Sequence, residues 1–575
     1  MQKFLALLLT ICCNTIVAQS LQTTFEKSKG LETTTYDDCI QLYKKLSTQY
    51  NTIQLKEFGK TDAGYPLHLI VFSKDKTFSP TKWQNENKVV ILVNNGIHPG
   101  EPDGIDASMM LLRDAAIGKI NIPNNVIIAA IAVYNIGGCL NRNSYTRVNQ
   151  NGPLAYGFRG NAQNLDLNRD FIKSDSKEAQ TFAQIFHYFN PDIFMDNHVS
   201  DGADYQHTMT LLTTQQSKLG GPIGNFLHSV FEPSLYKGMK AKKWDMCPYV
   251  NFETANVDKG WTAFYDAPRY SSGYTSLFAT MGFVPETHML KPFVDRVKST
   301  YDLMQTMIEQ AAIHAKTIKE KRAASLKAIQ QQQQFALQFK VDTTRFDAIE
   351  FKGYTAEQKP SFVSGLDRLY YNHDKPFTKQ VKLYNYFTED KVVTKPKAYI
   401  IPQGWHAVIE RLQLNKVVMK SLQKDTMIQL EAYKIEDYKT ITRPYEKHYR
   451  HYDVKVSKSK QQIRFLKGDI IVYTGQMADR FLVETLEPTS DDGYFAWNFF
   501  DAILQQKEGY SDYRWEDVAA AYLEKNTALQ TSLQQKRKQD SAFAKNGSAQ
   551  LDFVYKNSPY YESAHLRYPV YRLVD

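Results

Sequence analysis

The sequence predicts an α/β fold, with a mixed, mostly buried sheet covered by helices on both faces, followed by a smaller α/β domain. Short apolar runs, such as Lys88–Asn94 and Val126–Tyr134, are typical of strands that are buried on both faces. Amphipathic runs with helical spacing, such as Ser176–Phe189, alternate with these strands. Such alternation is typical of a sheet that helices cover on both sides.

The first region contains the expected elements in a clear order. A helix is expected from Thr34 to about Tyr50, because Ile40, Tyr43 and Leu46 lie near helical spacing. The later elements are a turn at Asp62–Pro66, strands at Leu67–Phe72 and Lys88–Asn94, a helix at Ile105–Asp114, a strand at Val126–Tyr134, a helix at Ser176–Phe189 that Asn190-Pro191 ends, and a strand at Asp192–Asp196.

The second region begins after a long charged stretch. From Pro292 to about Phe339 the pattern predicts helix and includes the glutamine tract Gln330–Gln334. We therefore expect a large domain over residues 19–315, a helical connector over 316–345 and an accessory α/β domain over 346–575. The accessory elements are strands at Lys397–Ile401, Met427–Ile435, Val454–Val456 and Asp469–Tyr473, a helix that carries Trp405, Val408, Ile409 and Leu412, a helix from about Gln476, and a turn or cap at Ser490–Gly493.

The composition is that of an ordinary folded protein. The 70 basic and 61 acidic residues leave a net charge of +9, which is modest for 575 residues. The basic residues are dense only at Lys316–Arg322 and Lys536–Lys538, which we interpret as solvated helix faces. A nucleic-acid binder would need clustered basic and aromatic residues, and none are evident. Oligomeric state stays open.

The N-terminus predicts export. Met1-Gln2-Lys3 precedes the apolar run Phe4–Val17 and the small residue Ala18, which is typical of a secretory signal peptide over residues 1–18. The run is too short for a good membrane span, so no stable membrane insertion is expected after its removal. Lipid attachment at Cys12 or Cys13 is the less favoured alternative. We expect a secreted or periplasmic protein, and its three remaining cysteines form no disulfide framework.

A metal site is indicated at the loop that follows the strand Lys88–Asn94. Of thirteen histidines, only His98 has a glutamate three residues later, Glu101. His198 ends the strand-like run before it, and ligands of α/β enzymes collect at the carboxyl ends of strands. Two imidazoles and a carboxylate, with a fourth position open for water, make the usual ligand set of a hydrolytic zinc site. We expect one Zn²⁺ ion.

Between these ligands lies the segment Phe158-Arg159-Gly160-Asn161-Ala162-Gln163-Asn164-Leu165-Asp166-Leu167-Asn168-Arg169-Asp170-Phe171. Together with the His98/Glu101 pair, the later His198 and the still later Glu286, it resembles the zinc carboxypeptidases of the funnelin type. In that family an arginine, an acidic residue and an Asn-Arg pair follow at this spacing. The resemblance covers roughly residues 30–310 and does not extend to the C-terminal region.

The resemblance implies a role for each matching residue. His98, Glu101 and His198 would bind zinc, and Asp166 would accept a hydrogen bond from the far nitrogen of His98. The remaining roles concern the substrate: Asn168 and Arg169 would hold its carboxylate, Arg159 would stabilise the oxyanion, and Glu286 would be the general base.

Other positions are less determined by the pattern. The family has a tyrosine on a mobile loop, and among Tyr265, Tyr270 and Tyr274 we favour Tyr270. His288 is kept as a structural residue near the site, because three ligands are already present. Arg142 and Arg147 are candidates for lining the cleft and are not assigned a role.

The predicted function is that of a secreted zinc metallocarboxypeptidase, which hydrolyses an amide bond next to a free carboxylate. The alternative on the same fold is an amidase or endopeptidase of cell-wall peptides, so the partner is a peptide or a cell-wall peptide. A non-catalytic binding module is a further alternative, but such a protein would be expected to lack a ligand or the base. The preferred side chain and the role of the accessory domain are not indicated.

Overall fold

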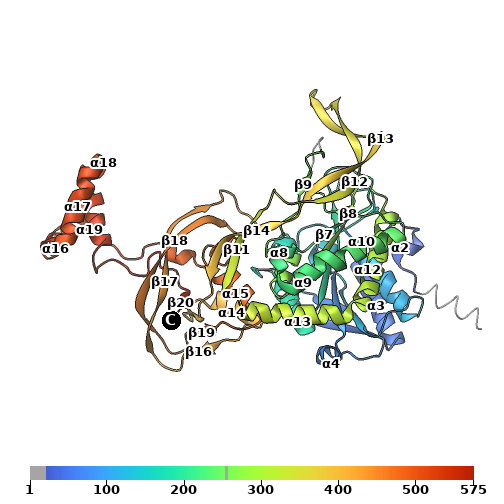
Figure 1. Cartoon of the computed structure of the whole chain (residues 1–575), viewed down its shortest axis with the longest axis horizontal. Helices are drawn as coiled ribbons and strands as arrows, with labels where there is room; N and C mark the ends of the chain where they lie inside the picture. Colours follow the sequence, from blue (N-terminus) through green and yellow to red (C-terminus); the bar gives the residue numbers. More distant parts are fainter. Residues whose placement is uncertain (1–20, 253–256, 575) are drawn as a thin grey trace, which may run out of the picture.

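The computed structural model describes residues 21–252 and 257–574, so the predicted signal peptide lies outside the described residues. Figure 1 shows three bodies along the chain: a large first domain, a second domain built around strands β15–β20, and a group of helices at the far end. Within the described residues, no helix combines the length and apolar character needed to cross a bilayer.

The first domain is built on a mixed sheet that has nine strands within the described residues. Its strand order is β1-β2-β4-β3-β5-β10-β7-β8, and β6 pairs with β10. The strands are β1 (Ile53–Lys60), β2 (Pro66–Phe72), β3 (Val89–Asn94), β4 (Val126–Ile131), β5 (Ile193–Asp196), β6 (His198–Ser200), β7 (Met209–Thr213), β8 (Cys247–Pro248) and β10 (Met281–His288). Strands β4, β3, β5 and β10 pair in parallel in this order, whereas the pairs β1–β2, β2–β4 and β10–β7 are antiparallel. The predicted fold class and the strands expected from apolar runs are confirmed.

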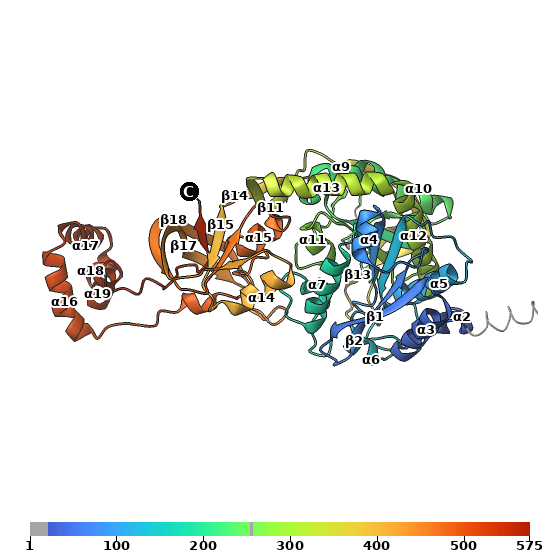
Figure 2. The same ribbon diagram turned by 90° about the horizontal axis from the view of Figure 1, so that it is seen from below.

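Helices cover both faces of this sheet (Figure 2). The helices of this domain are α2 (Thr24–Lys27), α3 (Tyr36–Gln49), α4 (Pro80–Asn85), α5 (Asp103–Ala116), α6 (Ile136–Leu140), α7 (Lys177–Phe189), α8 (Gln216–Leu219), α9 (Gly221–Phe226), α10 (Glu232–Ala241), α11 (Ser271–Ser276), α12 (Phe293–Ile313) and α13 (Ala315–Gln331). Helix α5 packs against α3 and α12, while α7 packs against β1 and β3. Every residue of β3 and β4 is buried, which explains why these strands read as continuous apolar runs. Cys39, Cys139 and Cys247 are free and buried.

A long hairpin joins the first domain rather than the second. Strands β12 (Asp347–Pro360) and β13 (Asp367–Tyr384) form the hairpin, and β13 also pairs with β9 (Trp261–Thr262). The side chains of Tyr205, Trp261 and Phe351 share a small apolar core there. The hairpin lies in the range expected for the accessory domain, but its base packs on the first domain and its tip projects away from it (Figure 1).

Two local predictions are wrong in this part of the chain. The helix expected to reach Phe339 ends at Gln331, and β11 (Gln334–Val341) pairs with β14 (Phe387–Thr394), because Phe335, Leu337 and Phe339 recur with the period of a strand. The basic run Lys316–Arg322 is not wholly solvated, since Arg322 is 4% exposed. Its guanidinium lies 3.3 Å from the Asp192 carboxylate.

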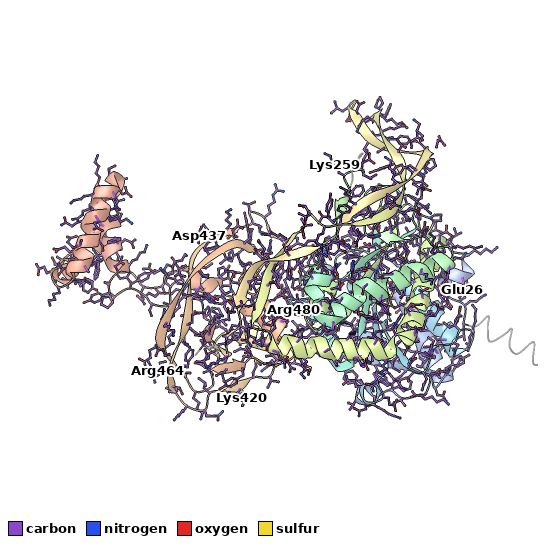
Figure 3. The ribbon with its side chains drawn as sticks, in the orientation of Figure 1. Glu26, Lys259, Lys420, Asp437, Arg464 and Arg480 are labelled. Atoms are coloured by element: carbon purple, nitrogen blue, oxygen red, sulfur yellow. The ribbon has the colours of Figure 1, made fainter. Side chains whose placement is uncertain are left out.

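The second domain is a further α/β unit. Within the described residues its sheet has six strands in the order β16-β19-β15-β20-β17-β18. These strands are β15 (Ala398–Ile401), β16 (Lys420–Ser421), β17 (Thr426–Thr440), β18 (His451–Phe465), β19 (Ile470–Tyr473) and β20 (Tyr571–Leu573), and the helices are α14 (His406–Leu414) and α15 (Asp479–Leu486). Helix α15 reaches the first domain, where Arg480 donates to the carbonyl of Leu219 at 3.4 Å (Figure 3).

The helical group at the far end was not anticipated from the sequence. It consists of α16 (Asp512–Glu524), α17 (Thr527–Gln539), α18 (Ser541–Ala544) and α19 (Gly547–Lys556). Trp515, Leu533 and Phe543 contribute to a small core of its own. The basic residues Lys536–Lys538 are exposed on α17, as predicted.

Candidate active site

The predicted metal ligands meet at the carboxyl edge of the first sheet. His98 and Glu101 lie on the loop between β3 and α5, while His198 is the first residue of β6. Gly96 turns the chain at the start of this loop with φ of 66°, and an added Cβ there would lie 2.9 Å from Ile105 Cδ1. A glycine is therefore needed to aim the loop back over the sheet.

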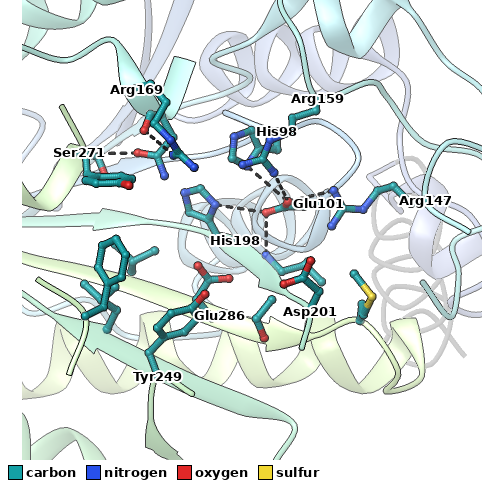
Figure 4. A pocket seen from close by; sticks show the side chains of 18 of the residues that line it. His98, Glu101, Arg147, Arg159, Arg169, His198, Asp201, Tyr249, Ser271 and Glu286 are labelled. Carbon is teal, nitrogen blue, oxygen red and sulfur yellow. Dashed lines mark hydrogen bonds and ion pairs between the residues drawn. The ribbon is translucent and has the colours of Figure 1, made fainter. Parts of the chain in front are cut away.

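Three ligand atoms converge within this loop and strand. One ligand atom from each of His98, Glu101 and His198 lies within 4.8 Å of the others, and all three side chains are buried. The Nδ1 atoms of His98 and His198 lie 3.4 and 3.2 Å from the Glu101 carboxylate (Figure 4). His98 Nδ1 has no hydrogen-bond partner among the described residues. Two nitrogens, one of which makes no hydrogen bond among the described residues, and one carboxylate fit a single divalent ion such as Zn²⁺.

A carboxylate lies on the far side of each histidine. Asp166 Oδ1 lies 2.9 Å from His98 Nε2, as predicted, and Asp196 Oδ2 lies 3.2 Å from His198 Nε2. Such partners orient an imidazole and raise its basicity toward a metal. The Asp196 contact was missed, although its place two residues before His198, at the end of β5, was the available signal. Burial alone would raise the pKa of Asp166, but His98 and Arg159 hold that pKa well below its usual range.

Two arginines border the ligand group. Arg159 donates from Nε to Asp166 Oδ2 at 3.0 Å, and its Nη1 lies 3.4 Å from Glu101. Arg147, which the sequence left unassigned, lies closer to Glu101, at 3.0 Å. Burial opposes ionisation of Glu101, yet Arg147 and His98 hold its pKa well below the usual value. The other unassigned residue, Arg142, instead donates to the carbonyls of Thr33 and Thr34.

The Asn-Arg pair lies beside the favoured tyrosine. Asn168 and Arg169 belong to a short 3₁₀ turn, Leu167–Arg169, and Asn168 Oδ1 accepts a hydrogen bond from Ser271 N at 3.3 Å. The Arg169 guanidinium lies 4.7 Å from the centroid of the Tyr270 ring. This is within the range of a cation–π contact.

The other two tyrosines are occupied elsewhere. Tyr274 is buried and donates to Asn415 Oδ1 at 2.6 Å, and Tyr265 packs against Phe339 and Phe387. Only Tyr270 of the three borders the same cavity as the ligands.

Glu286 lies next to the ligand group on the adjacent strand. Strands β6 and β10 run parallel with His198 opposite Glu286. Burial raises the pKa of Glu286 to about 8; the nearby His198 opposes this shift and Glu101 adds to it. His288, two residues later, accepts from Leu290 N and lies 3.0 Å from the Ala203 carbonyl, so it is not part of the ligand group.

A single cavity of about 530 Å³ connects these groups. It is bordered by every predicted site residue except Asp166. Apolar and aromatic side chains complete its wall: Leu212, Tyr249, Phe264, Val284 and Met289. In Figure 4, Arg169 and Ser271 lie on one side of His198 and Glu286, whereas Arg147 and Asp201 lie on the other.

An ion site with three protein ligands, an unbound carboxylate beside it and cationic groups over one cavity is the arrangement of zinc-dependent hydrolases. Residues 39–211 match the family model described as zinc carboxypeptidase, which confirms the predicted family over this stretch. The match covers only part of the first domain. The matched residues include the three ligands and Asn168-Arg169, and they end before Glu286.

Several solved structures are similar to part of this chain. Carboxypeptidase A from Helicoverpa armigera aligns at 15% identity with a TM-score of 0.37, covering 49% of this chain and 74% of that one. A metallo-carboxypeptidase from Burkholderia cenocepacia aligns at 16% identity with a TM-score of 0.35, covering 48% and 68%. One from Pseudomonas aeruginosa, in complex with (2-guanidinoethylmercapto)succinic acid, aligns at 13% identity with a TM-score of 0.36, covering 49% and 69%. A search of curated proteins found no match.

Proposed function

We propose that this protein removes residues from the C-terminus of peptides, by hydrolysing the amide bond next to a free carboxylate. The observation that carries the proposal is that Arg169, the His98–Glu101–His198 group and Glu286 border one cavity. A guanidinium can bind a carboxylate through two parallel hydrogen bonds, which favours substrates with a free C-terminus. The same cavity offers a site for the scissile carbonyl beside the metal ligands.

In this proposal His98, Glu101 and His198 hold one zinc ion, with Asp166 and Asp196 fixing the orientation of the two imidazoles. A bound zinc ion supplies Lewis-acid polarisation and lowers the pKa of water. Arg169 and Asn168 hold the substrate carboxylate, and Tyr270 lies over Arg169.

Proton transfer is the role of Glu286. Its buried carboxylate takes a proton from the attacking water and passes it to the leaving amine. A pKa raised by burial suits this exchange, because the group must both accept and release a proton near neutral pH. Arg159 stabilises the negative charge that develops on the carbonyl oxygen. Arg147 supports the same region by keeping Glu101 ionised.

Matched peptides test the proposal. Each peptide is supplied with a free and an amidated C-terminus, with and without a metal chelator. We expect release of the C-terminal residue only from the free form, and loss of that activity with chelator. Equal cleavage of the amidated peptides would rule out the anchor role of Arg169, and activity that resists the chelator would rule out zinc.

Export is part of the proposal as well. Residues 1–18 have the pattern of a signal peptide, which supports a mature protein that begins after Ala18. N-terminal sequencing of the protein from the periplasm or medium tests this, and an intact Met1 start there would contradict it.

A further inference from the structure

Two loops of the second domain reach the wall of the candidate active site. One is the turn Ser490–Gly493, which was expected to be only a turn or cap and which follows α15. The other is the tight turn at Glu446 and Lys447 between β17 and β18. Both contact segments of the first domain that border the predicted carboxylate anchor.

The first contact fixes the backbone and side chain of Arg269, the residue before Tyr270. Asp492 Oδ2 accepts from Arg269 N and from Arg269 Nε, each at 3.0 Å, while Oδ1 lies 2.9 Å from Nη2. The Asp492 side chain is 1% exposed. Burial would lower the pKa of Arg269, but Asp492 raises it above its usual value. Charge-assisted bonds of this kind are about twice as strong as neutral ones.

The fixed arginine leads directly to the anchor. The Tyr270 ring is close to two guanidinium groups, with Arg169 at 4.7 Å and Arg269 at 5.9 Å from its centroid. The Arg269 carbonyl accepts from Phe171 N at 3.3 Å. Ser271 N, on the other side of Tyr270, donates to Asn168 Oδ1. The loop of Tyr270 and the segment of Asn168 and Arg169 are therefore tied together.

The second contact holds the other end of that segment. Glu446 Oε2 accepts from Asp166 N at 2.8 Å, across 280 positions of sequence. Asp166 is the residue before the 3₁₀ turn that carries Asn168 and Arg169. The second domain thus holds both Asp166 and the Tyr270 loop, one through each carboxylate.

We infer that the second domain completes the carboxylate anchor of the first, with Asp492 and Glu446 as positioning residues for Tyr270 and Arg169. This inference rests on the proposed function, because it assumes that Arg169 binds the substrate carboxylate. Binding groups must be held to within a fraction of an ångström, which loops achieve only when neighbouring side chains fix them. Here those neighbours come from another domain.

The test compares Asp492→Asn with Asp491→Asn in the full-length protein. Both changes remove one carboxylate charge from the same turn, but Asp491 is exposed and its side chain accepts from Gln338 instead. Each variant is assayed with a peptide that has a free C-terminus and with its amidated form. We expect Asp492→Asn to raise KM for the free peptide about tenfold or more, with bound zinc unchanged. The Asp491→Asn variant should stay within about twofold of the wild type.

Hydrogen exchange gives a readout that does not depend on turnover. In Asp492→Asn the amides of residues 269–274 should exchange faster, because an uncharged amide replaces the carboxylate that binds both Arg269 N and the Arg269 guanidinium, while the amides of β3 and β5 keep their protection. Unchanged exchange at these residues together with an unchanged KM would overturn the inference.

A second variant decides the matter if Asp492→Asn fails to fold. Glu446→Ala removes the bond to Asp166 N from a partly exposed turn, and Lys447→Ala is its neighbour control. Glu446→Ala should raise KM for the free peptide severalfold, and an unchanged KM would overturn the inference. Failure of the proposed function looks different: there the wild type itself would cleave free and amidated peptides equally.

Discussion

The two domains each bury a cluster of charged side chains, and the clusters differ in one respect. In the second domain, Glu487 accepts from the hydroxyls of Tyr399 and Tyr433 at 2.8 and 2.6 Å, and lies 3.1 Å from Arg572. In the first domain, the cluster of His98, Glu101 and His198 is equally buried, but its side chains border a cavity of about 530 Å³.

The difference separates a structural cluster from a functional one. Burying charges is costly unless they are paired, and the Glu487 cluster is paired internally. The group around His98 is also paired internally, but it faces a cavity through which a ligand can reach it. Burial and charge alone therefore do not identify a site, whereas a buried charged cluster that borders a cavity is a candidate for one.

The largest expected effect follows from removing the unbound carboxylate of the first domain. Glu286→Gln should lower kcat by about 10²–10⁴, since a positioned base contributes about that much. Zinc content and the unfolding temperature should change little. Glu232→Gln is the matched control, because Glu232 is another carboxylate whose pKa burial raises, to about 7, and its side chain accepts from Thr213 away from the ligands. Turnover that survives Glu286→Gln would remove it as the base.

In the second domain the corresponding change should affect stability. Glu487→Gln leaves Arg572 partly unpaired in a buried place, which costs about 3–5 kcal/mol of unfolding free energy. Urea unfolding followed by circular dichroism measures the loss. Zinc binding should not change, and a drop in zinc affinity as large as the drop in stability would mean that the two clusters are coupled.

Removing the metal should change the stability of the first domain and not that of the second. Zinc at about 1,000 times its dissociation constant should stabilise the first domain by about 4 kcal/mol relative to the metal-free protein. Differential scanning calorimetry of both forms measures the shift, and His98→Ala should abolish it. A metal-free protein that melts at the same temperature as the zinc-loaded one would contradict a metal site.

The smallest effect concerns the junction between the domains. Burial lowers the pKa of His187 to about 4, and His187 Nε2 lies 3.3 Å from Asn415 Oδ1 of the second domain. Between pH 4 and the value of about 6.5 for an exposed histidine, the unfolded chain binds more protons than the folded protein. Unfolding free energy should therefore rise with pH across this window, by about 2–3 kcal/mol.

The matched substitutions test this assignment. His187→Gln should flatten the pH dependence between pH 4 and 6.5, whereas the exposed His406→Gln should leave it unchanged. Chemical unfolding at a series of pH values measures both, and an identical slope in His187→Gln and wild type would show that other groups cause it.

The sequence predicted the elements and site residues that a local pattern of residues determines. Continuous apolar runs predicted β3 and β4, and the motif Phe158–Phe171 predicted Arg159, Asn168 and Arg169, which border one cavity. The strand β11 was missed because a glutamine tract continues the helical pattern up to its start. Contacts such as Glu446 with Asp166 N have no local signal, because their partners are 280 positions apart.

The unassigned residues show the same limit within the site. Arg142 and Arg147 are five positions apart and were equivalent as sequence, yet one donates to backbone carbonyls and the other lies beside Glu101. Only the path of the chain between them decides which one enters the cavity. Residue types and order thus predicted the chemistry of the site, while its supporting contacts required the fold.

Strand β20 has a consequence for how the molecule is made. It inserts between β15 and β17 in the middle of the second sheet, although the chain reaches it only after helices α16–α19. During synthesis this sheet stays open until the helical group has been completed, so the first domain can fold earlier than the second. If Asp492 and Glu446 act as inferred, the metal ligands of a nascent chain would be in place well before the carboxylate anchor is complete. Proteolytic activity would then be delayed until the whole chain has been made.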